Sequence, residues 1–369
     1  VDAALCDDLL QEVFRLLPPA AGPAVSLVSR RWVALLRAST SRLTLRLPPA
    51  FTGASAPAAA GPLADLLSRY PYLSALAVVS ASSAAAHDAD AVLLAVSASP
   101  SATRLTALRF SVGSPVSPAA LREVSVTLSG LTSLHLTAVS PLSFRWLACL
   151  PCLNREALLQ FIRRRSAALH TLDLRLPLDL HNDHLLAIGA EQGYDTRGSL
   201  AVLRLQSCVL VTGDGLRSLA RTAIGAGIKD VALVSCDVVE REPGLLTFLS
   251  QSMRHLRRLD LSYNETLKDK EIGAMLSSCR NLIDIRFRGC RGITGESLVS
   301  LLRHCGQTVE VVDISRCPAI KVASVELFAQ RATRLNHLVI EVSSVSEELK
   351  AIARTKGMKV GPLPCEGSF

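Results

Sequence analysis

Apolar residues recur along most of the chain at the spacing L-x-x-L-x-L, followed by a cysteine or asparagine. Clear copies are LRRLDLSYN from Leu256, LIDIRFRGC from Leu282 and VEVVDISRC from Val309. Alternation of apolar residues with other residues over a short run is typical of a β-strand with one buried face. Each copy therefore predicts a short strand.

The copies repeat at nearly constant intervals. Other copies begin at Leu200, Ile228 and Leu335, and consecutive starts from 200 onward lie 26 to 28 residues apart. Weaker, less regular copies begin at Leu73, Leu105, Leu131 and Leu169. Between copies the sequence has helical periodicity, as in KDKEIGAMLSSC and TGESLVSLLRHC. A period of about 20–29 residues with one strand and one helix is typical of a leucine-rich repeat.

These repeats predict an α/β leucine-rich-repeat solenoid of about ten units, irregular before residue 200 and regular over 200–345. No unit buries its own apolar strand face, so neighbouring units must stack. We expect parallel strands on a concave side and helices on a convex side. Aromatic residues make up only 4% of the chain, so the core should consist of Leu, Val, Ile and Ala.

One position after the strand holds a cysteine or asparagine in five consecutive repeats. Its occupants are Cys208, Cys236, Asn264, Cys290 and Cys317. The chain turns sharply there, and buried backbone groups need a small polar partner, which an amide or, more weakly, a thiol supplies. We expect these cysteines, together with Cys279 and Cys305 before the next strands, to be reduced and structural.

Two short motifs have the spacing of metal ligands, and we interpret neither as a metal site. Cys149 and Cys152 form CLPC without a second ligand pair. HNDH, residues 181–184, lies between a strand and a helix, where Asp183 is expected to cap the helix. Near 150–155 the sequence passes directly into a helix, and our hypothesis is that one strand-and-loop segment is missing or compressed there. No cofactor is expected.

Two amphipathic helices precede the repeats. The first, Leu5–Pro19, has a broad apolar face, and we expect Asp8 to cap it. The second, Ala24–Leu36, carries a tryptophan within an apolar stripe. We therefore predict a helical module over 1–48 and a repeat domain over 49–369.

The residues of these two helices resemble an F-box, whose pattern is L-P-x-x-L-L-x-x-I-[FL]-x-x-L-P followed by a-x-x-V-[CS]-[KR]-x-W-x-x-L. Matching positions are Leu5, Asp8, Leu9, Leu10, Val13, Phe14, Leu17, Pro18, Ala24, Leu27, Val28, Ser29, Arg30, Trp32 and Leu35. The chain departs from the pattern at Cys6, where the family usually has proline. The alanine-rich composition also resembles that of plant proteins.

F-box proteins bind the Skp-family adaptor of a cullin-based ubiquitin ligase. The resemblance therefore implies the adaptor as a direct partner and the cullin scaffold as an indirect one. The adaptor-binding candidates are Leu5, Cys6, Asp8, Leu9, Leu10, Val13, Phe14, Leu17, Val28 and Trp32. Most of the contact should come from the first helix and the residues that lead into it, whereas Trp32 should pack inside the module.

Charged residues occupy concave positions of the regular repeats. The candidates for binding a protein substrate are Arg204, Asp260, Arg286, Arg288 and Asp313. Arginine pairs well with carboxylate and phosphate, so this surface could hold an acidic or phosphorylated segment. Alternatively, these residues are solvated and paired across strands. Nucleic-acid binding is not expected, because acidic residues interleave with the basic ones and no aromatic stripe accompanies them.

The chain lacks the common catalytic motifs G-x-x-x-x-G-K-[ST], G-x-S-x-G and H-E-x-x-H, which favours a non-catalytic protein. Neither a membrane-spanning apolar run nor a secretory signal is evident, so we expect the cytoplasm or nucleus. The leading hypothesis is a substrate receptor of a Skp–cullin–F-box ligase. The alternatives are a repeat interaction scaffold without a ligase role and a small-molecule co-receptor resembling plant auxin or jasmonate receptors.

Overall fold

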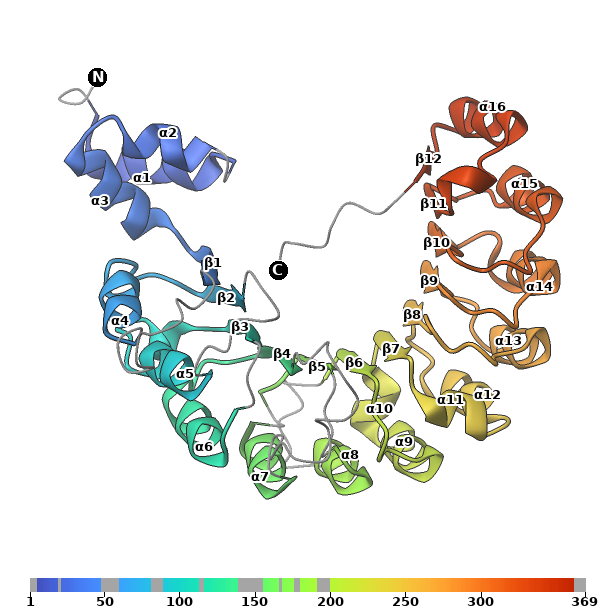
Figure 1. Ribbon diagram of the computed structural model, residues 1–369, viewed down its shortest axis with the longest axis horizontal. Helices are drawn as coiled ribbons and strands as arrows, with labels where there is room; N and C mark the ends of the chain where they lie inside the picture. The colour runs from blue at the N-terminus through green and yellow to red at the C-terminus, as the bar shows by residue number, and fades with distance from the viewer. Residues whose placement is uncertain are drawn as a thin grey trace, which may run out of the picture. The chain divides into compact units, whose positions relative to one another are not determined.

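The computed structural model divides into two units, Val1–Ala157 and Leu158–Phe369. It describes residues 5–18, 21–47, 60–80, 89–112, 116–138, 155–165, 168–175, 180–190 and 200–361. Within each unit, parallel strands lie side by side and helices cover one face of the sheet (Figure 1). Among the described residues, no helix is long and apolar enough to cross a lipid bilayer.

Unit 1 begins with three helices and continues with a parallel sheet. Its helices are α1 (Asp7–Leu16), α2 (Gly22–Ser26), α3 (Arg30–Ser39), α4 (Ala60–Ser68), α5 (Ala89–Ser97), the 3₁₀ helix η3 (Ala102–Arg104) and α6 (Pro118–Thr127). Its strands are β1 (Arg42–Leu47), β2 (Ala75–Ser80), β3 (Ala107–Val112) and β4 (Ser133–Ala138). These strands pair in parallel, in chain order.

Unit 2 continues the alternation of strand and helix. Its strands are β5 (Thr171–Arg175), β6 (Val202–Gln206), β7 (Asp230–Val234), β8 (Arg258–Asp260), β9 (Asp284–Arg286), β10 (Val311–Asp313), β11 (His337–Val339) and β12 (Lys359–Val360). Each pairs in parallel with the next.

The division between the units falls inside α7 (Arg155–Arg165). The remaining helices are α8 (Asn182–Gly189), α9 (Gly213–Ala220), α10 (Ala223–Gly227), α11 (Asp237–Arg241), α12 (Leu245–Ser252), α13 (Asp269–Leu276), α14 (Gly295–Cys305), α15 (Val322–Arg331), η4 (Val342–Ser344) and α16 (Glu347–Lys356). Leucines of the repeat pattern, such as Leu259 and Leu261, are buried between the strands and these helices.

The predicted strands are confirmed. Each of the strands β2 to β11 begins two residues after the first apolar residue of its L-x-x-L-x-L pattern. The fold class is therefore α/β, with stacked units that each hold a strand and one or more helices. β1 pairs with β2, so the sheet already begins within residues 1–48, which the sequence assigns to the helical module.

The turn after each of the strands β6 to β10 has the same backbone conformation. The residue before the cysteine or asparagine position has a positive φ in five repeats: Ser207 (55°), Ser235 (50°), Tyr263 (61°), Gly289 (74°) and Arg316 (58°). This left-handed conformation is unfavourable for residues with a Cβ. Its recurrence shows that the turn geometry is imposed by the stacking of units rather than by local glycine content.

In four of these five repeats, the residue that follows the left-handed turn joins its repeat to the preceding one. Asn264 donates through Nδ2 to the Leu233 carbonyl at 2.8 Å. Equivalent thiol contacts run from Cys236 to the Leu205 carbonyl, from Cys290 to Leu261 and from Cys317 to Phe287, at 3.5, 3.1 and 3.0 Å. Burial raises the pKa of Cys290 to about 12 and that of Cys317 to about 11. Cys290 and Cys317 are therefore protonated structural donors, as predicted.

Candidate protein-interaction surfaces

The helices α1, α2 and α3 have a hydrophobic core of their own. Leu10, Phe14, Val25 and Leu35 are buried in it, and Leu5, Leu17, Trp32 and Leu36 pack against them. The ring centroids of Phe14 and Trp32 are 5.3 Å apart, with the rings tilted by 58°. Trp32 therefore packs inside the helical module, as the sequence predicts.

Both predicted helices of the module differ from the prediction: the first lacks the predicted cap, and the second is interrupted. The N-cap of α1 is Cys6 and no side chain caps the helix, so the capping role predicted for Asp8 is wrong. The predicted helix Ala24–Leu36 is two helices, α2 and α3. Ser29 interrupts it because its backbone is extended and its hydroxyl accepts a hydrogen bond from the Trp32 amide at 3.2 Å. Such a cap satisfies the amides of a new helix start.

Arg31 ties the start of α3 to the start of α1. Its Nε and Nη2 atoms donate to Asp7 Oδ1 at 2.9 and 2.6 Å, and Nη2 also donates to the Leu5 carbonyl at 2.9 Å. These charge-assisted bonds fix how the chain enters α1. The neighbouring Arg30 is exposed. Nothing in the spacing of the sequence indicates that only the second arginine makes this contact.

An apolar stripe remains exposed on α1. It consists of Leu9, Val13 and Leu16, which expose 56%, 48% and 86% of their surface. These residues follow one another at helical spacing, so they share one side of the helix, while Leu10 and Phe14 face the core. In the turn between α2 and α3, Leu27 and Val28 are also exposed.

The structure separates the adaptor-binding candidates into two groups. Buried or packed against the core are Leu5, Leu10, Phe14, Leu17 and Trp32. Exposed are Cys6, Asp8, Leu9, Val13 and Val28. The first group holds the module together, and the second presents the more exposed side chains to a partner. Leu16 belongs to the apolar face of the predicted first helix and is an exposed member of the stripe, but it is not among the adaptor-binding candidates.

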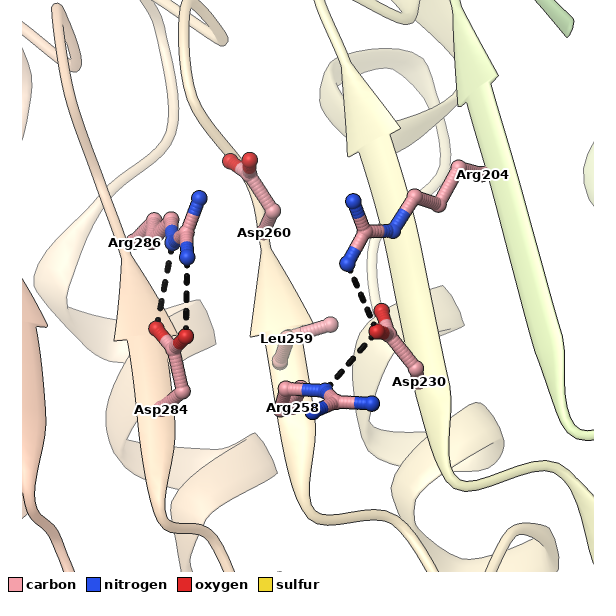
Figure 2. Close-up of a pocket in the computed structure, with 7 residues that line it drawn as sticks. All are labelled: Arg204, Asp230, Arg258, Leu259, Asp260, Asp284 and Arg286. Carbon is pink, nitrogen blue, oxygen red and sulfur yellow. Dashed lines mark hydrogen bonds and ion pairs between the residues drawn. The ribbon is translucent and has the colours of Figure 1, made fainter. Parts of the chain in front are cut away.

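A hollow on the sheet of unit 2 brings charged side chains together (Figure 2). Its lining residues are Arg204, Asp230, Arg258, Leu259, Asp260, Asp284 and Arg286. The charged ones form two rows across β6 to β9. Asp230, Arg258 and Asp284 are paired in register at the strand starts. Arg204, Asp260 and Arg286 lie two residues further along their strands and therefore point to the same face.

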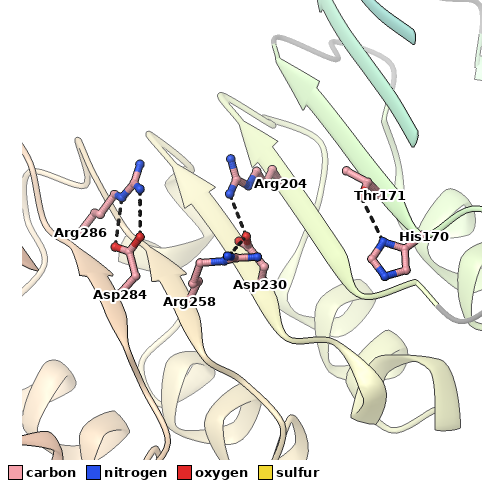
Figure 3. A network of polar contacts seen from close by, with 7 residues as sticks. All are labelled: His170, Thr171, Arg204, Asp230, Arg258, Asp284 and Arg286. Carbon is pink, nitrogen blue, oxygen red and sulfur yellow. Dashed lines mark hydrogen bonds and ion pairs between the residues drawn. The ribbon is translucent and has the colours of Figure 1, made fainter. Parts of the chain in front are cut away.

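Two carboxylates already bind the arginines of this hollow (Figure 3). The buried Asp230 accepts hydrogen bonds from Arg204 at 2.7 Å and from Arg258 at 2.8 Å. Asp284 binds both Nε and Nη2 of Arg286, at 3.1 and 2.9 Å. The predicted residues Arg204 and Arg286 are thus paired within and across strands. Asp230, Arg258 and Asp284 are not among the predicted substrate-binding residues. Each is the first residue of its strand and occupies the same position of the repeat, which is the signal that could have identified them.

Asp260 lies near both arginines but hydrogen-bonds within its own chain segment. Its Oδ1 atom accepts from the Ser262 amide at 2.9 Å. Burial raises the pKa of Asp260 above its ordinary value, although the hydrogen bonds from Ser262 and the charges of Arg286 and Arg204 act in the opposite direction. This carboxyl is therefore held in an environment that disfavours its charge.

The other two substrate-binding candidates do not line the hollow. Asp313 accepts hydrogen bonds from the amide and hydroxyl of Ser315, at 2.9 and 2.6 Å. The guanidinium of Arg288 lies 5.9 Å from the ring centroid of Tyr263. The structure therefore brings together Arg204, Asp260 and Arg286 and leaves these two at separate sites on the same sheet.

Among the described residues, no group of three or more His, Cys, Asp or Glu side chains is placed to hold a metal ion. HNDH instead begins α8, where the N-cap is His181 rather than the predicted Asp183. The His181 amide donates to Nδ1 of the buried His184 at 3.0 Å. The CLPC cysteines and the segment 150–154 lie outside the described residues, so the hypothesis of a missing repeat segment stays a prediction.

No protein-family model matches the chain. Among solved structures, it is similar to the leucine-rich repeat-containing protein LegL7 from Legionella pneumophila, with a TM-score of 0.50 at 15% identity over 85% of this chain and 97% of that one. A chain of the yeast Rad7–Elc1 complex gives 0.46 at 12% identity over 96% and 92%. The TLR13–ssRNA13 complex gives 0.42 at 16% identity over 76% and 35%. The likeness to LegL7, together with the stacked strand-and-helix units, shows that the chain has the leucine-rich-repeat fold.

Proposed function

We propose that the chain is the substrate-recognition subunit of an SCF-type ubiquitin ligase. The helices α1 to α3 bind a Skp-family adaptor, which links the chain to a cullin, and the repeat sheet holds a protein substrate. The observation that carries this proposal is the exposed apolar stripe Leu9, Val13 and Leu16. It lies on a small module in which F-box-like residues such as Leu10 and Phe14 fill the core.

The stripe has the properties of a docking surface. A contiguous exposed apolar patch on a soluble protein commonly marks an interaction site. Full burial of one Leu or Val side chain contributes about 1.5–3 kcal/mol. The three stripe residues are already partly shielded, so their burial would supply a few kcal/mol at most. That is a useful share of the roughly 8 kcal/mol of a micromolar complex.

In this proposal the chain is non-catalytic and needs no cofactor. It holds a substrate protein near an activated ubiquitin, and the gain comes from proximity and effective concentration. The partners are proteins, in the cytoplasm or nucleus, rather than nucleic acid or a membrane. A plant source fits the alanine-rich composition.

Co-purification of the full chain with a Skp-family adaptor tests the proposal. The Leu9→Asp/Val13→Asp variant changes exposed stripe residues, so it should fold and fail to bind. The matched control is Leu94→Asp/Val126→Asp, which changes residues with similar exposure on α5 and α6. We expect wild type and control to form a stoichiometric complex. A folded wild type without a complex, or equal loss in both variants, would contradict the proposal.

A second candidate function is a repeat interaction scaffold without a ligase role, and Cys6 is the observation that favours it. Cys6 is exposed at the start of α1, where the F-box pattern has proline. Its φ of −72° and ψ of 160° are close to values that proline adopts. Cys6→Pro should therefore fold without strain. Adaptor binding by Cys6→Pro but not by wild type would favour the scaffold.

A further inference from the structure

The parallel strands of unit 2 all begin along one edge of the sheet, next to the loops that lead into them from the preceding helices. Four exposed cations lie in the loops before β7, β8 and β9, and we call them the basic edge: Lys229, Arg254, Arg257 and Arg280. Arg258, the first residue of β8, lies beside them, as do Asp230 and Asp284, the first residues of β7 and β9, which also line the hollow (Figure 3).

Backbone hydrogen bonds fix the residues of the basic edge close together. The Arg257 amide donates to the Lys229 carbonyl at 2.8 Å, and the Ile283 amide donates to the Arg257 carbonyl at 2.8 Å. These loops are therefore as close as neighbouring strands, which lie about 4.8 Å apart. The basic edge spans three such positions, or about 10 Å.

The cations of the basic edge lack the carboxylate partners that two arginines have at the opposite edge, where the strands end. Over 200–361, in which every residue is described, none of the four cations of the basic edge forms an ion pair. At the opposite edge, Arg291 pairs with Glu265 at 3.6 Å and Arg316 with Glu341 at 3.8 Å. The carboxylates of Asp230 and Asp284 at the adjoining strand starts are bound by Arg204, Arg258 and Arg286, and Glu310 lies in the next loop, before β10. The like charges of the basic edge therefore repel one another, and an anion would stabilise them.

Helix dipoles do not account for Arg257 and Arg280, whereas Lys229 and Arg254 each lie two residues beyond a helix end, that of α10 and of α12. The dipole effect falls off within the last turn of a helix. Arg280 lies four residues beyond the end of α13, and Arg257 lies five beyond the end of α12. Lys356, by contrast, binds a helix end directly. Its Nζ atom donates to carbonyls at the end of α15 at 2.7 to 2.9 Å.

We propose that the basic edge is the docking site for a short acidic segment of a protein partner. Arginine forks match carboxylates, and three of the four cations are arginines. A span of about 10 Å equals roughly three residues of an extended peptide. The arginines of the concave hollow are already bound to Asp230 and Asp284, whereas those of the basic edge are available.

A nucleic acid fits the basic edge less well. Single strands bind along grooves with aromatic side chains for stacking, and the basic edge holds no aromatic residue. Duplex binding usually neutralises phosphates along a longer footprint than three neighbouring loops. This proposal depends on the proposed function in one respect: the repeat domain must hold a protein. It does not depend on adaptor binding, which uses α1 to α3.

Fluorescence anisotropy on the full chain tests the proposal with a labelled oligoglutamate peptide, its oligoglutamine counterpart and a short DNA duplex. The test variant is Arg254→Glu/Arg257→Glu/Arg280→Glu. The matched control, Lys268→Glu/Lys270→Glu/Lys321→Glu, reverses exposed cations at the opposite edge. Replacing the same three arginines with glutamine gives a milder second variant, and circular dichroism checks the fold of each.

We expect oligoglutamate to bind wild type and the control alike, and to bind the test variant at least about tenfold more weakly. Binding should fall as salt rises, and oligoglutamine should not bind. Failure of wild type to bind oligoglutamate, equal loss in the control, or tighter binding of the duplex would overturn the proposal. Adaptor co-purification should be unchanged in every variant, so failure of the ligase role would be seen separately.

Discussion

Replacing Asn264 tests whether the residue after each left-handed turn joins neighbouring repeats. The Asn264 amide donates to the carbonyls of Leu233 and Leu261, both at 2.8 Å, and accepts from the Cys236 amide at 3.0 Å. In Asn264→Ala the Leu261 carbonyl keeps a contact from Cys290 at 3.1 Å. Two buried backbone groups then lose their partner, at about 1–3 kcal/mol each. We expect a loss of about 3–5 kcal/mol.

Asn264→Cys is the matched comparison, because cysteine occupies the same position in neighbouring repeats. Its thiol can donate to the Leu233 carbonyl, so only the Cys236 amide is left without a partner. The expected loss is about 1–3 kcal/mol. Urea unfolding followed by circular dichroism measures both variants through the midpoint and the slope. A loss under about 1 kcal/mol for alanine, or equal losses for the two variants, would refute the reasoning.

Three further substitutions have predicted outcomes. Trp32→Ala should cost about 2–3 kcal/mol, less than a fully buried tryptophan, since Trp32 is half-buried against Phe14; thermal unfolding measures it. Gly289→Ala should cost at least about 1–2 kcal/mol, because φ is 74° and the new Cβ would lie 2.6 Å from Tyr263; urea unfolding measures it. Asp260→Asn should be more stable than wild type at neutral pH and equal to it in acid, as denaturation at both pH values would show.

The sign of the Asp260 prediction follows from its raised pKa. Burial makes the folded state bind the proton more tightly than the unfolded state does. Wild-type stability is therefore greatest below the unfolded pKa, about 3.9, and falls as pH rises through the folded pKa. A gain for Asp260→Asn in acid but not at neutral pH would contradict this. An unchanged midpoint for Trp32→Ala or Gly289→Ala would contradict the packing arguments for those residues.

The sequence predicts the repeats well because each leucine position of the pattern is buried at the same place in its repeat, between the strand and the helices. A strand with a buried face must recur for units to stack, so the L-x-x-L-x-L pattern locates β2 to β11, although its period is constant only from residue 200 onward. β12 has only two residues, too few for a pattern. The sequence of β1, RLTLRL, does alternate between leucine and other residues. It directly follows residues that resemble an F-box, and the sequence therefore assigns it to the helical module rather than to the sheet.

The interaction surfaces are harder to predict than the fold. The sequence identifies Arg204 and Arg286 as concave but not their partners, because pairing depends on how strands align across repeats. The equivalent repeat positions of Asp230 and Arg258, 28 residues apart, could have indicated this contact. The break between α2 and α3 depends on one hydroxyl group. Ser29 caps the start of α3, whereas the same residue could also lie within a continuous helix, and the sequence does not distinguish the two.

Hydrogen–deuterium exchange of the full chain, alone and with a Skp-family adaptor, tests directly whether the helices α1 to α3 bind the adaptor. We expect the adaptor to slow exchange in α1 and in the turn between α2 and α3. Exposed apolar residues of these two segments are Leu9, Val13, Leu16, Leu27 and Val28. Strands β5 to β12 should be unaffected. Exchange that stays unchanged in α1, or protection confined to the repeat sheet, would contradict an adaptor-binding role for the helical module.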